Sequence, residues 1–229
     1  MEIVITDLTR FSNSEIVCIA GINQETGECV RPLPYIKLAE CKKHNILPGN
    51  VIDGDFKKVQ NVNKPHLEDY NYTKLKRKKI CTSDEFKTLL TKDISSSISE
   101  GFGYSFPEKG KVIPKKSAPS KSIITLKINT NNIEIVKDGF KEGKIRLNLL
   151  DNDDKRFSFL SITDLGFYNY AMKHFQDKDF PKIINNFIRK QDTVFLRVGL
   201  GREYQDGFWL QINGIYTFPN FDSEIRSYS

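Results

Sequence analysis

Apolar and polar positions alternate over several short stretches of the chain, and this pattern predicts β-strands. In the first half, strands are predicted over residues 2–9, 15–22, 28–31 and 51–59, with a fifth strand somewhere within 66–81. The run at 15–22 is continuously apolar, which is typical of a strand that is covered on both faces. Pro32 and Pro34 end the third strand, because proline lacks the amide donor that a ladder requires. A short helix is predicted over 36–45.

The second half repeats the same order of elements. Its strands are predicted over 124–128, 133–135, 145–149, 157–159, 192–200 and 208–218. The Asp206-Gly207 pair predicts a tight hairpin between the last two strands. One helix is predicted over 165–176 and a second from Pro181, which suits a first helical turn.

Each half therefore has the order of a meander, a helical stretch and a final pair of strands. This is the element order of an OB-fold, a small Greek-key barrel that binds oligonucleotides or oligosaccharides. We predict a mainly β protein with some α, built as two tandem OB-like barrels. The first domain covers 1–104 and carries an appended helix near 83–92, with Thr82 and Glu85 as a capping box. A basic linker or mobile loop follows at 105–121, and the second domain covers 122–229 with a helical insertion at 164–190.

Positive charge is concentrated in two segments. The chain has a net charge of +6, and most of its excess positive charge comes from two clusters of basic residues: Lys74, Lys76, Arg77, Lys78 and Lys79, and then Lys109, Lys111, Lys115, Lys116 and Lys121. Concentrated positive charge attracts polyanions such as nucleic acid. The alternative is that these segments are solvated loops that contribute only solubility.

Three arginines interrupt otherwise apolar strands near their ends: Arg31, Arg197 and Arg202. A guanidinium group in such a place can bind phosphate or stack on a base, or it can pair with a neighbouring acid. Trp209 shares one face of its strand with Gln211 and Asn213, which predicts an outward ring that could stack on a base. The alternative is that a loop or the other barrel covers this ring.

No group of residues indicates catalysis, a metal site or a cofactor. The four cysteines have no CxxC spacing, and we expect free thiols. The acidic Asp151-Asn152-Asp153-Asp154 stretch lacks the spacing of a calcium loop. No apolar run approaches the ~20 residues of a membrane span, and the N-terminus does not have the layout of a signal peptide. We therefore expect a cytoplasmic protein with no membrane partner.

The segments VCIAGINQETGECVRPLP and FLRVGLGREYQDGFWLQINGIYTFP resemble a family of prokaryotic dual OB-containing domains. The resemblance covers nearly the whole chain and implies two barrels and an expectation of nucleic-acid binding. It carries no catalytic signature and assigns no site residue.

These observations predict a non-enzymatic protein that binds single-stranded or deformed nucleic acid with little sequence preference, DNA or RNA alike. The alternative is a protein-interaction or small-ligand-binding accessory module of a bacterial defence or repair system. An unrecognised hydrolase or transferase is a third hypothesis, which metal-dependent activity at Asp153 and Asp154 would support.

Overall fold

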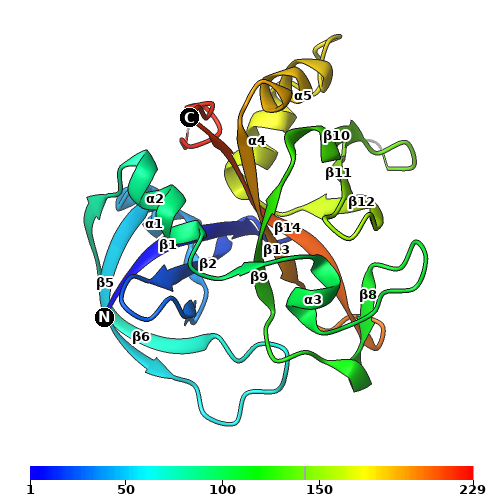
Figure 1. Cartoon of the computed structure of the whole chain (residues 1–229). Helices are drawn as coiled ribbons and strands as arrows, with labels where there is room; N and C mark the ends of the chain where they lie inside the picture. The colour runs from blue at the N-terminus through cyan, green and yellow to red at the C-terminus, as the bar shows by residue number, and fades with distance from the viewer. Residues whose placement is uncertain (142, 229) are drawn as a thin grey trace.

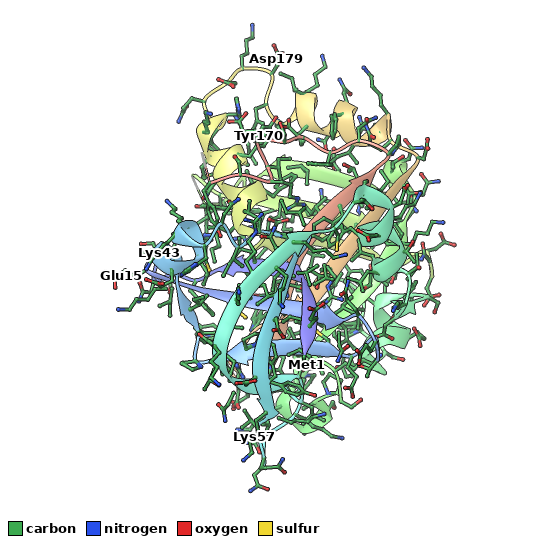
Figure 2. The ribbon with its side chains drawn as sticks, turned by 90° about the vertical axis from the view of Figure 1, so that its left-hand side faces the viewer. Met1, Glu15, Lys43, Lys57, Tyr170 and Asp179 are labelled. Atoms are coloured by element: carbon green, nitrogen blue, oxygen red, sulfur yellow. The ribbon has the colours of Figure 1, made fainter. Side chains whose placement is uncertain are left out.

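The first half of the chain closes into a five-stranded barrel, shown in blue and cyan in Figure 1. The computed structural model describes residues 1–141 and 143–228. The barrel strands are β1 (Glu2–Arg10), β2 (Ile16–Asn23), β3 (Cys29–Leu33), β5 (Asn50–Lys58) and β6 (Asp69–Ile80). The short β4 (Ile36–Lys37) pairs with the start of β2, and α1 (Leu38–Lys43) follows it.

The order of strands around this barrel is β1-β5-β6-β3-β2, and β2 pairs with β1 to close it. The β3–β6 pair is parallel and the other pairs are antiparallel. The helix α1 lies between the third and fourth barrel strands in the chain. This arrangement confirms the predicted OB-like architecture.

The second half has the same connectivity, with its first strand in two pieces. β9 (Ile123–Ile128) and β10 (Ile133–Lys137) are joined by a single 3-10 turn, Thr130–Asn132. The remaining strands are β11 (Ile145–Leu150), β12 (Arg156–Ile162), β13 (Thr193–Leu200) and β14 (Gly207–Phe218). The helices α4 (Leu165–Lys173) and α5 (Lys182–Arg189) stand between β12 and β13, as predicted.

The pairing of these strands matches the first barrel. β9 pairs with β13 and β10 pairs with β11, just as β1 pairs with β5 at its start and with β2 along most of its length. β12 pairs with β14 in parallel, like β3 with β6. Despite the 3-10 turn, β9 and β10 together therefore take the place of one barrel strand that pairs with both β13 and β11.

The segment between the barrels packs mainly against the second one. It contains α2 (Ser83–Leu90), β7 (Ile94–Ser95), α3 (Ile98–Phe102), β8 (Val112–Pro114) and a 3-10 turn, Lys115–Ser117. β7 pairs with β9 and β8 pairs with β14. Ile98 and Ile113 are fully buried in the core of the second barrel. The stretch predicted as a basic linker at 105–121 thus contains a strand and a core residue.

The two barrels share an apolar interface. Val4 of β1 and Ile22 of β2 meet Phe195 of β13 and Tyr216 of β14, and α2 adds Phe86, Leu89 and Leu90. The predicted capping box of α2 is present at Thr82 and Glu85. β2 is covered on both faces as predicted, because Val17 and Ile19 enter the barrel core while Ile22 faces the second barrel. No helix in the described residues is long and apolar enough to cross a bilayer.

Candidate functional site

The second barrel leaves open the face on which OB-folds commonly hold their ligands. OB-folds hold ligands on the face of their second and third strands, framed by the loop after strand 1 and the loop between strands 4 and 5. In the second barrel these strands are β11 and β12, and residues alternate along both between buried and accessible. Figure 1 shows β10, β11 and β12 on the right, on the far side from the first barrel.

Phe159 is held outward on this face by a β-bulge. The register of β11 and β12 shifts between Leu147 and Leu149, so that Ser158 and Phe159 oppose the single residue Asn148. Phe159 has a φ of 56°, a left-handed conformation that is strained for a bulky residue. The Asn148 side-chain oxygen accepts a hydrogen bond from the Phe159 amide at 3.0 Å. Bulges commonly redirect a side chain next to functional sites.

A second ring and a lysine lie beside Phe159. Phe140, in the connection between β10 and β11, is 90% exposed, and its ring centroid lies 6.3 Å from that of Phe159. Lys111 donates from its Nζ to the carbonyl oxygens of Ser158 and Phe159 at 3.4 Å. Burial, and then the positive charge of nearby Arg146, lower the pKa of Lys111. The face therefore presents two accessible rings beside Lys111, while Arg146 is paired with Asp138 at 2.8 Å.

The predicted lysines of 109–121 have different surroundings and do not form one cluster. Lys109 and Lys116 are exposed, while Lys111 is half-buried against β12. Lys115 pairs with Glu203 at 2.9 Å, and Lys121 pairs with Asp93 at 2.9 Å. Of these lysines, Lys111 reaches the open face, through its contact with β12.

The other predicted lysine run lies on the first barrel. Lys74, Lys76, Arg77, Lys78 and Lys79 all belong to β6. Three of them pair with acids: Lys74 with Asp55, Lys78 with Asp53 and Lys79 with Glu85, at 3.4–3.8 Å. These contacts are exposed and contribute little stability. The structure does not bring this run to the open face of the second barrel.

The corresponding face of the first barrel is covered. β2, β3 and the loops 11–15 and 59–68 face the second barrel, and a cavity of about 220 Å³ remains between them. The first barrel contributes the larger share of its lining, and residues 200–202, Gln211 and Asn213 of the second barrel supply most of the other wall. Two of the three predicted arginines, Arg31 and Arg202, line this cavity.

Asp69 holds both of these arginines. The Arg31 Nε donates to Asp69 Oδ1 at 2.6 Å, and Arg202 donates to Asp69 Oδ2 from both terminal nitrogens at 3.2 Å. Arg202 also donates from Nε to the Tyr35 hydroxyl at 2.8 Å. Arg31 reaches the second barrel's leading segment through Ser122 Oγ at 3.1 Å. Both arginines thus pair with an acid, but that acid is Asp69, which sequence spacing did not indicate.

Several buried polar atoms around this cavity lack partners. Among the described residues, six buried side-chain atoms make no hydrogen bond, and four of them belong to Asp7, Arg31 and His66. Those three side chains are 1%, 5% and 5% exposed, and all line the cavity. The Arg31 Nη2 has only a 4.0 Å contact with Glu68. Unpaired buried polar groups are costly, so their grouping around one void indicates a place for a polar ligand.

Arg197, the third predicted arginine, is used inside the protein. It is 2% exposed and donates to Asp7 Oδ2 at 2.9 Å, Thr125 Oγ1 at 2.8 Å and Cys29 Sγ at 3.5 Å. Each of its three nitrogens has a partner. Arg197 therefore joins the two barrels, and its burial keeps it from contact with an external ligand.

Trp209 lies on the outer face of β14, as predicted. Its ring is 38% exposed, and its Nε1 donates to the Tyr204 carbonyl oxygen at 3.3 Å. Gln211 and Asn213, on the same face, are turned toward the junction and line the cavity. Trp209 is the residue next to Gln211 on this face of β14, just outside the cavity, and part of its ring is accessible to solvent.

His66 experiences a strongly positive and dry environment. Burial, followed by the positive charges of Arg31 and Arg202, lowers the pKa of His66 to about 3. Neither ring nitrogen makes a well-formed hydrogen bond, although the Gly201 backbone is near enough to interact. The imidazole is consequently neutral at physiological pH.

The depressed pKa of His66 predicts acid sensitivity. As pH falls below 6.5, the unfolded chain binds a proton at His66 while the folded protein does not, so stability falls steadily down to about pH 3. Between pH 7 and pH 5 this single group should cost about 2 kcal/mol of unfolding free energy. His66→Phe keeps a ring against Phe208 and should remove that loss. Urea unfolding at both pH values measures it, with exposed His44→Phe as the control. Equal pH dependence of His66→Phe and wild type would refute the assignment.

Nothing in the described residues forms a metal site or an activated nucleophile. No group of three or more His, Cys, Asp or Glu side chains is positioned to hold a metal ion there. The cysteines are free, as predicted. Burial raises the pKa of the Cys18 thiol, which lines the junction cavity, to about 11. The thiol form, which is a poor nucleophile, therefore dominates at neutral pH.

Sequence reasoning missed Phe140, Phe159, Asp7, His66 and Asp69. Phe140 had a usable signal, because it is a lone aromatic residue in the charged stretch KDGFKEGK. Asp7 could also have been found from the sequence, because it is an acid inside an otherwise apolar strand. His66 and Asp69 had none, because they come from the region whose strand was least well defined.

The family comparison agrees with this architecture. A family model described as a dual OB-containing domain matches residues 1–215. A search of curated proteins found no match to the chain.

Proposed function

Because the chain belongs to the family of dual OB-containing domains, we propose that it is a non-enzymatic protein that binds single-stranded or locally deformed nucleic acid. The observation that carries this proposal is the open ligand face of the second barrel. There a bulge turns Phe159 outward beside the 90% exposed Phe140. Accessible rings on an OB-fold face are the usual platform on which bases stack.

The surrounding charges suit a phosphate backbone. Lys111 contacts the backbone of Phe159, and Arg146 pairs with Asp138, which also accepts from the Phe140 amide. The β6 lysines add positive charge on the other barrel. Such a surface binds with little sequence preference and with an affinity that falls steeply as salt rises. A cytoplasmic location fits this proposal, since free thiols persist in a reducing compartment.

Removing the two rings should weaken binding strongly. Phe140→Ala/Phe159→Ala should lower the affinity for a single-stranded oligonucleotide at least about tenfold, because each stacked base contributes roughly 1–3 kcal/mol. Fluorescence anisotropy with single-stranded and duplex oligonucleotides, at two salt concentrations, measures this. Phe221→Ala, which removes another exposed ring, is the matched control. If the double variant binds single strands as tightly as wild type does, the face is not the binding surface.

A protein-interaction role is the second candidate. A largely apolar cavity of about 210 Å³ lies where residues 47–50 and 80–83 meet the end of β14, and Ile80 and Phe221 are exposed at its edge. An exposed apolar group of this kind favours a protein partner. Partner binding that does not change with salt, together with no oligonucleotide binding at low salt, would support this role instead.

A further inference from the structure

The junction cavity has the character of a ligand site that is separate from the open face. We propose that it binds one nucleotide unit, with the base inside the cavity and the phosphate at its mouth. The occupant is a nucleoside monophosphate group, whether free or at the end of a strand. The proposal does not depend on Phe140 and Phe159, which lie on the other side of the second barrel.

The volume of the cavity sets the size of the group that it can take. An apolar cavity of about 150 Å³ holds benzene, and this one measures about 220 Å³. One heterocyclic base fits such a space, whereas a continuous strand does not. The second barrel also closes the face across which a strand would ordinarily lie, through the contacts of Arg202 with Asp69 and Tyr35.

The unpaired atoms call for a ligand with both donors and acceptors. Arg31 Nη2 offers a donor, and Asp7 Oδ1 offers an acceptor that a simple anion would not satisfy. The edge of a nucleobase carries both kinds of group. Phe11 and Tyr35, whose ring centroids are 4.6 Å apart, add an aromatic wall at the same cavity.

Two arginines at the mouth of the cavity, Arg10 and Arg202, would bind the phosphate group of the nucleotide. The Arg202 side chain lines the cavity and is 44% exposed, and Asp69 and Tyr35 hold its guanidinium in place. Arg10 also lines the cavity, with its guanidinium held over the Tyr168 ring at 3.8 Å. Planar guanidinium groups are well suited to phosphate. A nucleotide bound base-first therefore places its charge between Arg10 and Arg202.

Two variants separate the base from the phosphate. Ala20→Leu fills the cavity from β2, where Ala20 is fully buried and lines the wall. Arg202→Ala removes the rim charge and leaves the cavity open. Exposed Ala39→Leu is the control for the first substitution and Arg189→Ala, on α5, for the second. Thermal unfolding establishes that each variant is folded.

The test is calorimetric titration with adenosine and uridine 5′-monophosphate, the matching nucleosides, and inorganic phosphate. Wild type should bind a nucleotide at least about tenfold more tightly than phosphate alone. Ala20→Leu should lose nucleotide binding, while in Arg202→Ala the nucleotide should bind no better than the nucleoside. The preference for nucleotide over nucleoside in Arg202→Ala decides the proposal even if Ala20→Leu does not fold.

Three results would overturn the proposal: phosphate binding as tightly as the nucleotide, a folded Ala20→Leu that keeps wild-type affinity, or an Arg202→Ala variant that still prefers the nucleotide to the nucleoside. Competition by a short single strand, in the Phe140→Ala/Phe159→Ala background, identifies the source of the nucleotide. Competition supports the end of a strand, and its absence supports a free nucleotide. Loss of oligonucleotide binding at the open face would refute the proposed function and leave this result unchanged.

Discussion

Replacing Arg197 with methionine should lower the free energy of unfolding by about 3–5 kcal/mol, because one partner of a buried ion pair is lost. Arg197 and Asp7 are 2% and 1% exposed, and they join β13 of the second barrel to β1 of the first. Without the guanidinium, the Asp7 carboxylate keeps the Thr6 hydroxyl at 2.7 Å. Its Oδ1 is already unpaired, so the charge is left largely uncompensated.

Denaturant unfolding followed by circular dichroism measures this loss. Exposed Arg189→Met is the control and should change stability by no more than about 0.5 kcal/mol. The double variant Asp7→Asn/Arg197→Met should be more stable than Arg197→Met, because it removes the stranded charge as well. A loss below about 1 kcal/mol for Arg197→Met, or no recovery in the double variant, would contradict this account.

Gly166→Ala should destabilise the protein by about 1–3 kcal/mol, the usual cost of overpacking. Gly166 is the second residue of α4, where alanine would ordinarily be favoured by about 1 kcal/mol. A Cβ at this position would lie 2.0 Å from the backbone carbonyl oxygen of Ile225. The C-terminal segment must therefore move, and it carries Ile225 into the core and Arg226 onto Asp164 at 3.1 Å.

Whether Gly166→Ala raises or lowers stability shows which of two effects is larger, helix propensity or the contact with Ile225. Gly139→Ala is the matched control, because a Cβ there would meet nothing within 4 Å. Thermal unfolding of the two variants compares them directly. If Gly166→Ala is neutral or stabilising, helix propensity outweighs the contact with Ile225, and the C-terminal segment is less firmly held than its contacts indicate.

Local pattern was sufficient to predict both barrels, because each strand has one face in a core. Ile145, Leu147 and Leu149 enter the second core while the residues between them stay accessible, and the alternation in sequence reports this directly. The region 94–121 has no such periodicity. Its elements, α3 and β8, are too short to show a period, and Ile113 is buried because β14 lies against it.

The candidate sites were less predictable, because they depend on contacts that are distant in sequence. The arginines were identifiable as charges at the ends of apolar strands. Their partners were not, since Asp69 is 38 residues from Arg31 and Asp7 is 190 residues from Arg197. Similarly, the outward turn of Phe159 follows from the register of β11 against β12, which alternation alone does not determine.

Two ion pairs between acids of the first barrel and arginines of the second hold the two halves of the chain together. Asp7 and Asp69 belong to the first barrel, while their partners Arg197 and Arg202 belong to the second. A chain divided near residue 120 would leave Asp7 without Arg197 and would expose the apolar surfaces through which the barrels meet. The two repeats are therefore expected to unfold together, because the second barrel covers the face of the first barrel that an isolated OB-fold would leave exposed.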